Sequence, residues 1–144
     1  MKKIVTITAA LILAASAWAQ SPEKMSYQAV IRDASNTLVA STTVGMEISI
    51  LQGGISGTAV YVETQTPMTN ANGLVSLEIG TGTVAIGDFT TIDWANDTFF
   101  IKTETDPTGG SNYTITGTTQ LMSVPYALYA KTSGSSTPGP HKDL

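Results

Sequence analysis

Acidic side chains come closest to forming a catalytic or metal-binding set in this chain. The chain contains no cysteine and one histidine, His141. Thiol nucleophiles, Cys/His zinc sites and a Ser/His/Asp triad within the fold are therefore excluded. Two carboxylates could hydrolyse a glycosidic bond, and loop carboxylates are the usual protein ligands of Ca²⁺. The candidate acids lie close together in the sequence: Asp88, Asp93, Asp97, Glu104 and Asp106.

These acids are more typical of solvent-exposed loops than of a catalytic pair. The stretch DFTTIDWAND does not follow EF-hand spacing, and no second catalytic element accompanies it. Trp94 lies between Asp93 and Asp97 and offers an aromatic face on which a sugar could stack. We therefore predict a protein that is not an enzyme, with no catalytic residue, metal site or cofactor. Trp94, Asp93 and Asp97 form a candidate ligand surface, with a glycan or Ca²⁺ as the alternative ligands.

The first residues indicate export. Lys2 and Lys3 precede an apolar run from Ile4 to about Ala15, and Ala17-Trp18-Ala19 stands before Gln20. This is the three-part pattern of a cleaved signal peptide, and the apolar run is too short for a good membrane span. We predict a signal peptide over residues 1–19, no membrane span after its removal, and a secreted or cell-surface location.

Composition narrows the class of partner. Charged residues make up 12% of the chain, and the formal net charge is −4. A weakly acidic surface argues against nucleic acid and against anionic membranes as partners. An exported domain without cysteine must fold by packing, with no disulfide to help it.

Alternation of apolar and polar residues dominates the middle of the chain. Turns rich in Gly, Asn or Pro separate the alternating segments at intervals of about ten residues, which is typical of an antiparallel sandwich or barrel. We predict an all-β fold, an antiparallel β-sandwich of about seven strands, immunoglobulin-like or transthyretin-like, forming one domain over residues 20–122. The clearest segments are 25–33, 44–52, 58–66, 74–82, 98–106 and 112–122.

The same alternation predicts the core. The side chains expected to face inward are Met25, Tyr27, Ala29, Ile31, Val44, Met46, Ile48, Ile50, Ala59, Tyr61, Phe99 and Ile101. In the segment 74–82 we expect Leu74, Leu77 and Ile79 as the apolar set. The stretch 83–98 has no regular period, so we predict a connection with a short helical turn whose aromatics cover one end of the core.

The chain closes on an apolar segment and then a Gly/Ser/Pro-rich tail. Ser123-Val124-Pro125 is a helix-start signal, so we predict a short C-terminal helix over residues 123–132 and a flexible tail over 133–144. Two helical turns are marginal alone, and we expect them to dock on the sandwich or to pair with copies of themselves. The candidate interaction surface is Leu121, Val124, Tyr126, Leu128 and Tyr129.

The segments YQAVIRD, VSLEIGTG and DWANDTFFIKTETDPTGGSNYTITGTTQLMSVPYALYAKTS carry a resemblance. Together they resemble the N-terminal β-domain of secreted and surface proteins of Bacteroidota, over about residues 25–132. In that family a QLxSVPYALYA-type run closes the domain, and a collagen-like, coiled-coil or tail-fibre-type stalk often follows. Here a single Pro-Gly-Pro precedes the last residues. A stand-alone module and a truncated copy of a longer fibre protein therefore both stay open.

The resemblance and the residues together indicate a role without chemistry. We expect a secreted or cell-surface structural or adhesion module that mounts a C-terminal extension or partner. The closing helix would join it to a stalk or to further copies in a homo-oligomer. The alternative is a carbohydrate- or calcium-binding β-sandwich module.

Overall fold

The computed structural model describes residues 23–122, which form seven antiparallel strands in two sheets. The strands are β1 (Met25–Val30), β2 (Gly45–Gln52), β3 (Thr58–Gln65), β4 (Leu74–Ile79), β5 (Thr83–Ile86), β6 (Phe99–Asp106) and β7 (Ile115–Gln120). One short 3-10 turn, η1 (Phe89–Thr91), lies between β5 and β6. The expected all-β class is confirmed, whereas the helix predicted at 123–132 lies outside the described residues.

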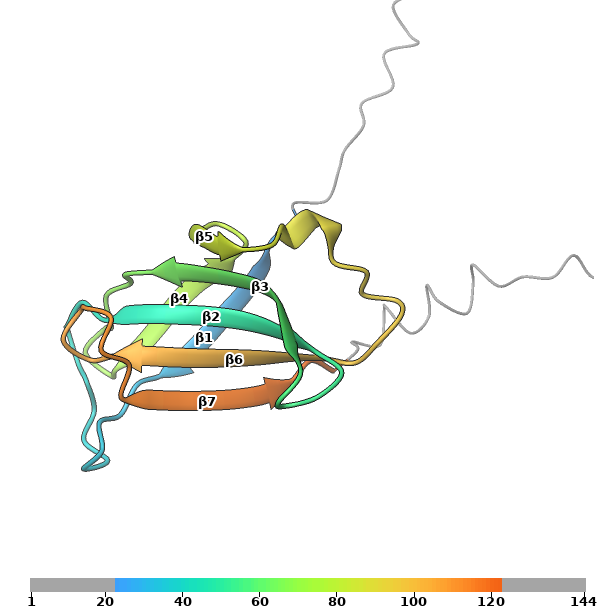
Figure 1. Ribbon diagram of the computed structural model, residues 1–144. Coiled ribbons are helices and arrows are strands. Elements are labelled where there is room, and N and C mark those ends of the chain that lie inside the picture. Colours follow the sequence, from blue (N-terminus) through green and yellow to red (C-terminus); the bar gives the residue numbers. More distant parts are fainter. Residues whose placement is uncertain (1–22, 123–144) are drawn as a thin grey trace, which may run out of the picture.

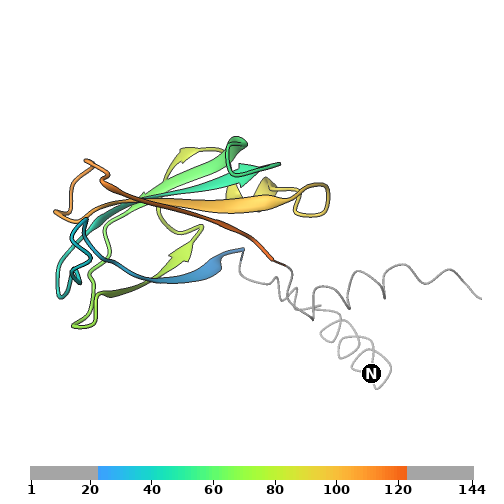
Figure 2. The same cartoon turned by 90° about the horizontal axis from the view of Figure 1, so that it is seen from below.

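The strands divide unequally between two layers. β5, β3, β2, β6 and β7 form a five-stranded sheet in that order, and β1 pairs with β4 alone. Figure 1 shows β1 and β4 crossing behind the larger sheet, and Figure 2 shows the two layers from below. A two-stranded ribbon is marginal by itself in water, so β1 and β4 depend on packing against the larger sheet.

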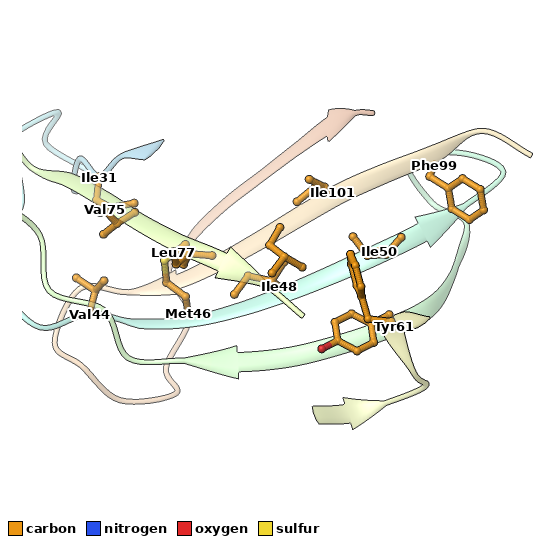
Figure 3. Close-up of a cluster of buried hydrophobic side chains, with 12 residues drawn as sticks. Ile31, Val44, Met46, Ile48, Ile50, Tyr61, Val75, Leu77, Phe99 and Ile101 are labelled. Carbon is orange, nitrogen blue, oxygen red and sulfur yellow. The ribbon is translucent and has the colours of Figure 1, made fainter. Parts of the chain in front are cut away.

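One hydrophobic core fills the space between the layers. Figure 3 shows side chains of β2 and β6 on one side and of β4 on the other, converging between the ribbons. The predicted inward residues of β1, Met25, Tyr27 and Ala29, are half-buried against the core, and Ile31 follows them at 5% exposed. In β2, Met46, Ile48 and Ile50 are at most 1% exposed. The predicted inward faces of these two strands are therefore confirmed.

Two sequence expectations need correction. In β4 the buried residues are Val75, Leu77 and Ile79, while Leu74 is only half-buried and pairs with the exposed Val30. Leu74 is one register position from Val75, so it points to the opposite face of the ribbon. The stretch 83–98 contains the short helical turn that we expect, but its first residues form the edge strand β5, where we predict only a connection.

Candidate functional site: the chain-exit pocket

Four aromatic rings close one end of the core. Tyr61 of β3 contacts Phe89 of η1 edge-on, with ring centroids 5.4 Å apart. Trp94 then stacks edge-on against Phe89 at 5.6 Å and against Phe99 of β6 at 5.0 Å. Edge-to-face packing at such separations is the preferred geometry of aromatic pairs. The expected aromatic cover over one end of the core is therefore present.

Local hydrogen bonds hold the loop that carries Trp94. Asp88 caps η1, because its Oδ1 accepts from the Thr90 amide at 2.9 Å and from the Thr90 hydroxyl at 2.7 Å. The hydroxyl bond and then the amide bond lower the pKa of Asp88 below its ordinary value. Asp93 accepts from the Ala95 amide at 3.2 Å and from the Asn96 side chain. These acids fix the shape of their own loop.

Trp94 is the most exposed of the four rings, and it lies beside both ends of the described chain. On one side a pocket of about 310 Å³ is lined by Trp94, Phe89, Ile92, Thr90 and the entering residues Glu23 and Lys24. On the other side lies a pocket of about 490 Å³, which we call the exit pocket. Its lining residues are Trp94, Asp97, Thr98, Phe99, Gln120, Leu121 and Met122.

The exit pocket brings together residues of the candidate ligand surface and of the candidate interaction surface, which we predict as separate surfaces. Trp94 and Asp97 belong to the candidate ligand surface, and Leu121 belongs to the candidate interaction surface. The Leu121 amide donates to the carbonyl of Phe99 at 2.8 Å, so the pairing of β7 with β6 continues to the wall of the pocket. Asp93 does not line the pocket. Val124, Tyr126, Leu128 and Tyr129 lie outside the described residues.

The pocket combines an apolar wall with a polar rim. Trp94, Phe99, Leu121 and Met122 supply apolar surface, while the remaining lining residues, Asp97, Thr98 and Gln120, supply hydrogen-bonding groups. Within residues 23–122, no group of three or more His, Asp or Glu side chains could hold a metal ion. That stretch also has no helix of the length and apolarity needed to cross a bilayer. The apolar wall of the exit pocket suits it to binding an apolar or aromatic group.

A buried acidic residue that the sequence alone does not point to, Glu63, holds the connection between the two sheets. Glu63 of β3 is fully buried. Its Oε2 accepts from the Tyr61 hydroxyl at 2.6 Å and from the amides of Gly80 and Gly82 at 2.9 and 3.1 Å, and its Oε1 accepts from Gln65 Nε2 at 2.6 Å. The two glycines belong to the turn from β4 to β5, so Glu63 ties that turn to β3 of the larger sheet.

The turn that Glu63 holds has a backbone shape that favours glycine. Gly80 has φ of +101°, a conformation that residues with a side chain rarely adopt. Burial raises the pKa of the Tyr61 hydroxyl far above its ordinary value, and the hydrogen bond to Glu63 raises it further. Tyr61 thus remains a neutral hydrogen-bond donor. A signal in the sequence does exist, because Glu63 and Gln65 continue the alternating face of β3 on which the core residue Tyr61 lies.

A second buried acid, Asp106, orders the turn between β6 and β7. Its Oδ1 accepts from the amide and hydroxyl of Thr108 at 2.8 and 2.6 Å, and its Oδ2 accepts from the Asn112 amide at 2.9 Å. The Thr108 hydroxyl is the largest cause that lowers the pKa of Asp106, followed by the Thr108 amide. Asp106 therefore acts as a turn brace, far along the strand from the exit pocket.

Comparison with known proteins adds one finding. Residues 26–123 match the family given as Domain of unknown function (DUF8740). The chain belongs to the DUF8740 family. No curated protein and no solved structure matches it. The matched range of the DUF8740 domain includes β2 to β7 and nearly all of β1, and it ends just beyond the exit pocket.

Proposed function

We propose that this DUF8740 domain is a secreted or cell-surface structural or adhesion module, without enzymatic activity, that mounts a C-terminal extension or partner. The observation that carries the proposal is the position of the end of β7. Leu121 is hydrogen-bonded to β6 and packs against the core, so the end of the described chain is held at a fixed point beside Trp94. A fixed chain end with an aromatic pocket beside it supports a role in which the domain holds a C-terminal extension or partner in place.

The finer fold assignment belongs to this proposal. Two antiparallel sheets around one core support a sandwich of immunoglobulin-like or transthyretin-like type. Sandwiches of this kind commonly serve as rigid modules of cell-surface proteins. The predicted signal peptide and the resemblance to surface proteins of Bacteroidota support export.

The acids of the domain support a structural role over a catalytic one. Asp88, Asp93 and Asp106 each accept hydrogen bonds from amides of their own loop or turn. Carboxylates occupied in this way brace turns. Glu63, the most buried acid, has both oxygens filled by donors from the fold itself.

Export can be tested in cells whose secretion machinery recognises the predicted signal peptide. The full chain is produced with an epitope tag after Leu144, beside a matched chain that lacks residues 2–19. We expect the mature protein to begin at Gln20 by intact mass and to be found outside the cytoplasm, with the matched chain retained inside. Retention of the full chain in the cytoplasm with residues 1–19 attached would contradict the proposal.

A second candidate, a carbohydrate-binding module, rests on the exposure of Trp94. Its side chain is 41% exposed at a pocket whose rim carries Asp97 and Gln120. An aromatic face beside hydrogen-bonding groups is a workable sugar site. A glycan array tests this candidate: binding that Trp94→Ala abolishes and Ile55→Ala preserves would support it, since Ile55 is exposed but absent from the pocket lining. No glycan signal would dispose of it.

A further inference from the structure

The exit pocket leaves apolar surface uncovered where the described chain ends. Trp94 is 41% exposed and Met122 is 76% exposed, and both line the pocket. The pocket volume of about 490 Å³ falls within the usual range for ligand sites, roughly 300–1,000 Å³. When another apolar group covers the apolar side chains around a pocket, apolar surface is removed from water and the free energy falls.

The residues that follow Met122 have suitable chemistry to cover it. The sequence continues Ser-Val-Pro-Tyr-Ala-Leu-Tyr-Ala-Lys over residues 123–131, with apolar or aromatic side chains at Val124, Tyr126, Leu128 and Tyr129. Each residue extends the reach of a chain by at most about 3.6 Å. Side chains two to seven positions beyond the pocket wall can therefore fold back onto it.

We propose that residues 123–131, which we call the closing segment, pack into the exit pocket of their own domain, with an aromatic or leucine side chain against Trp94. Covalent attachment to the domain favours the closing segment over the other possible occupants of the pocket, a second copy of the chain or a free sugar. A tethered segment meets its site at an effective concentration in the millimolar range, which a second copy or a free sugar would seldom match. The inference rests on the proposed function for its purpose, because a docked closing segment would give the mount a fixed direction.

The two tryptophans of the chain make the contact measurable. They are Trp18 and Trp94, so the full chain carrying Trp18→Phe has Trp94 as its single tryptophan. Acrylamide quenching of its fluorescence reports how much of the Trp94 ring meets solvent. The purified protein is compared with two variants of itself: a Tyr126→Ser, Leu128→Ser double variant and a chain that ends at Thr132.

We expect the double variant to raise the quenching constant at least about twofold, because removing apolar cover returns the ring to water. The chain that ends at Thr132 keeps the closing segment and should match the full chain. Equal quenching in the full chain and the double variant would overturn the proposal. Protection of Trp94 that disappears on dilution would also overturn it, since a second copy would then be the occupant.

A second readout avoids any change to the docking side chains. The chain has no cysteine, so a nitroxide placed on Ala130→Cys is its only label, and Thr137→Cys is the matched control. We expect the label at position 130 to quench Trp94 strongly and the label at position 137 to quench it weakly. Equal, weak quenching by both labels would contradict docking. All these measurements use purified protein, so a failure of the export proposal leaves their outcome unchanged.

Discussion

At the scale of single residues, Glu63 holds the connection between the two sheets. Glu63→Gln replaces one acceptor oxygen by an amide donor, which must then face either the Gln65 side chain or the donors of Tyr61, Gly80 and Gly82. Leaving a buried donor unsatisfied costs about 1–3 kcal/mol. We expect the free energy of unfolding in urea to fall by about that amount.

Glu78→Gln is the matched control for Glu63. Glu78 makes an exposed ion pair with Lys24 at 2.6 Å, and such pairs contribute less than about 1 kcal/mol. Equal losses in the two variants would show that the buried hydrogen bonds of Glu63 contribute no more than a surface charge does.

The lowered pKa of Asp106 predicts how the stability of the domain depends on pH. The pKa of this residue is lower in the folded chain than the value of about 3.9 expected when unfolded. The stability that this shift contributes is present above the unfolded pKa and is lost as the pH falls through the lowered folded value. We therefore expect Asp106→Asn to destabilise the domain at pH 7, and the difference from the unaltered chain to shrink between pH 5 and pH 3.

Thr108 provides the control for that pH dependence. Thr108→Ala removes the hydroxyl that lowers the pKa of Asp106 most, whereas Thr108→Ser keeps a hydroxyl at the same place. Urea unfolding at several pH values should show part of the Asp106→Asn effect in the alanine variant and little of it in the serine variant. The same pH profile in both would contradict the role assigned to the hydroxyl.

At the scale of elements, the turn between β2 and β3 depends on one of its glycines. A Cβ added at Gly57 would lie 1.9 Å from the carbonyl oxygen of Gln52, whereas at Gly54 it would meet nothing within 4 Å. Overpacking of this kind typically costs about 1–3 kcal/mol. We expect Gly57→Ala to lower the melting temperature clearly and Gly54→Ala to leave it nearly unchanged, and similar shifts in the two would contradict the close approach.

Sequence periodicity predicts strands well where one face is buried. β1 alternates between half-buried and exposed residues, and its inward residues could be read from the alternation alone. The alternation also gives the inward residues Met46, Ile48 and Ile50 of β2, although Ser49 and Leu51 on the other face are buried as well. All four residues of β5 are exposed, and its apolar Val84 and Ile86 lie at the edge of the sheet, so burial leaves no pattern there. In β4 the adjacent apolar pair Leu74 and Val75 makes the phase ambiguous, and only the pairing with β1 settles it.

At the scale of the whole molecule, both sheets share one core and should unfold together. Ile79 lies on the two-stranded sheet and is fully buried. Truncating a buried isoleucine to alanine costs about 2–5 kcal/mol. We expect Ile79→Ala to destabilise the whole domain by about that amount in urea, with the same midpoint by Trp94 fluorescence and by circular dichroism.

Val30→Ala on the same sheet is the control, because Val30 is exposed and its loss should change stability by less than about 0.5 kcal/mol. Different midpoints for the two probes would mean that β1 and β4 unfold separately from the larger sheet.

The sequence indicates two sheets around a core, but not their division into two and five strands. That division depends on pairings between distant segments, such as β2 with β6, which local periodicity does not encode. The same limit applies to the exit pocket. Trp94 and Leu121 are far apart in the sequence, and only the pairing of β7 with β6 brings them to one pocket.

We propose that the domain is exported and that it presents whatever follows Met122 beside the exit pocket. Labelling of intact cells tests it most directly, with a folded reporter fused after Leu144 and stained by an antibody that does not enter cells. We predict that the full fusion stains intact cells or is recovered from the medium, that the fusion lacking residues 2–19 does neither, and that the melting temperature of the domain is unchanged. Staining that appears only after the cells are opened would contradict the account.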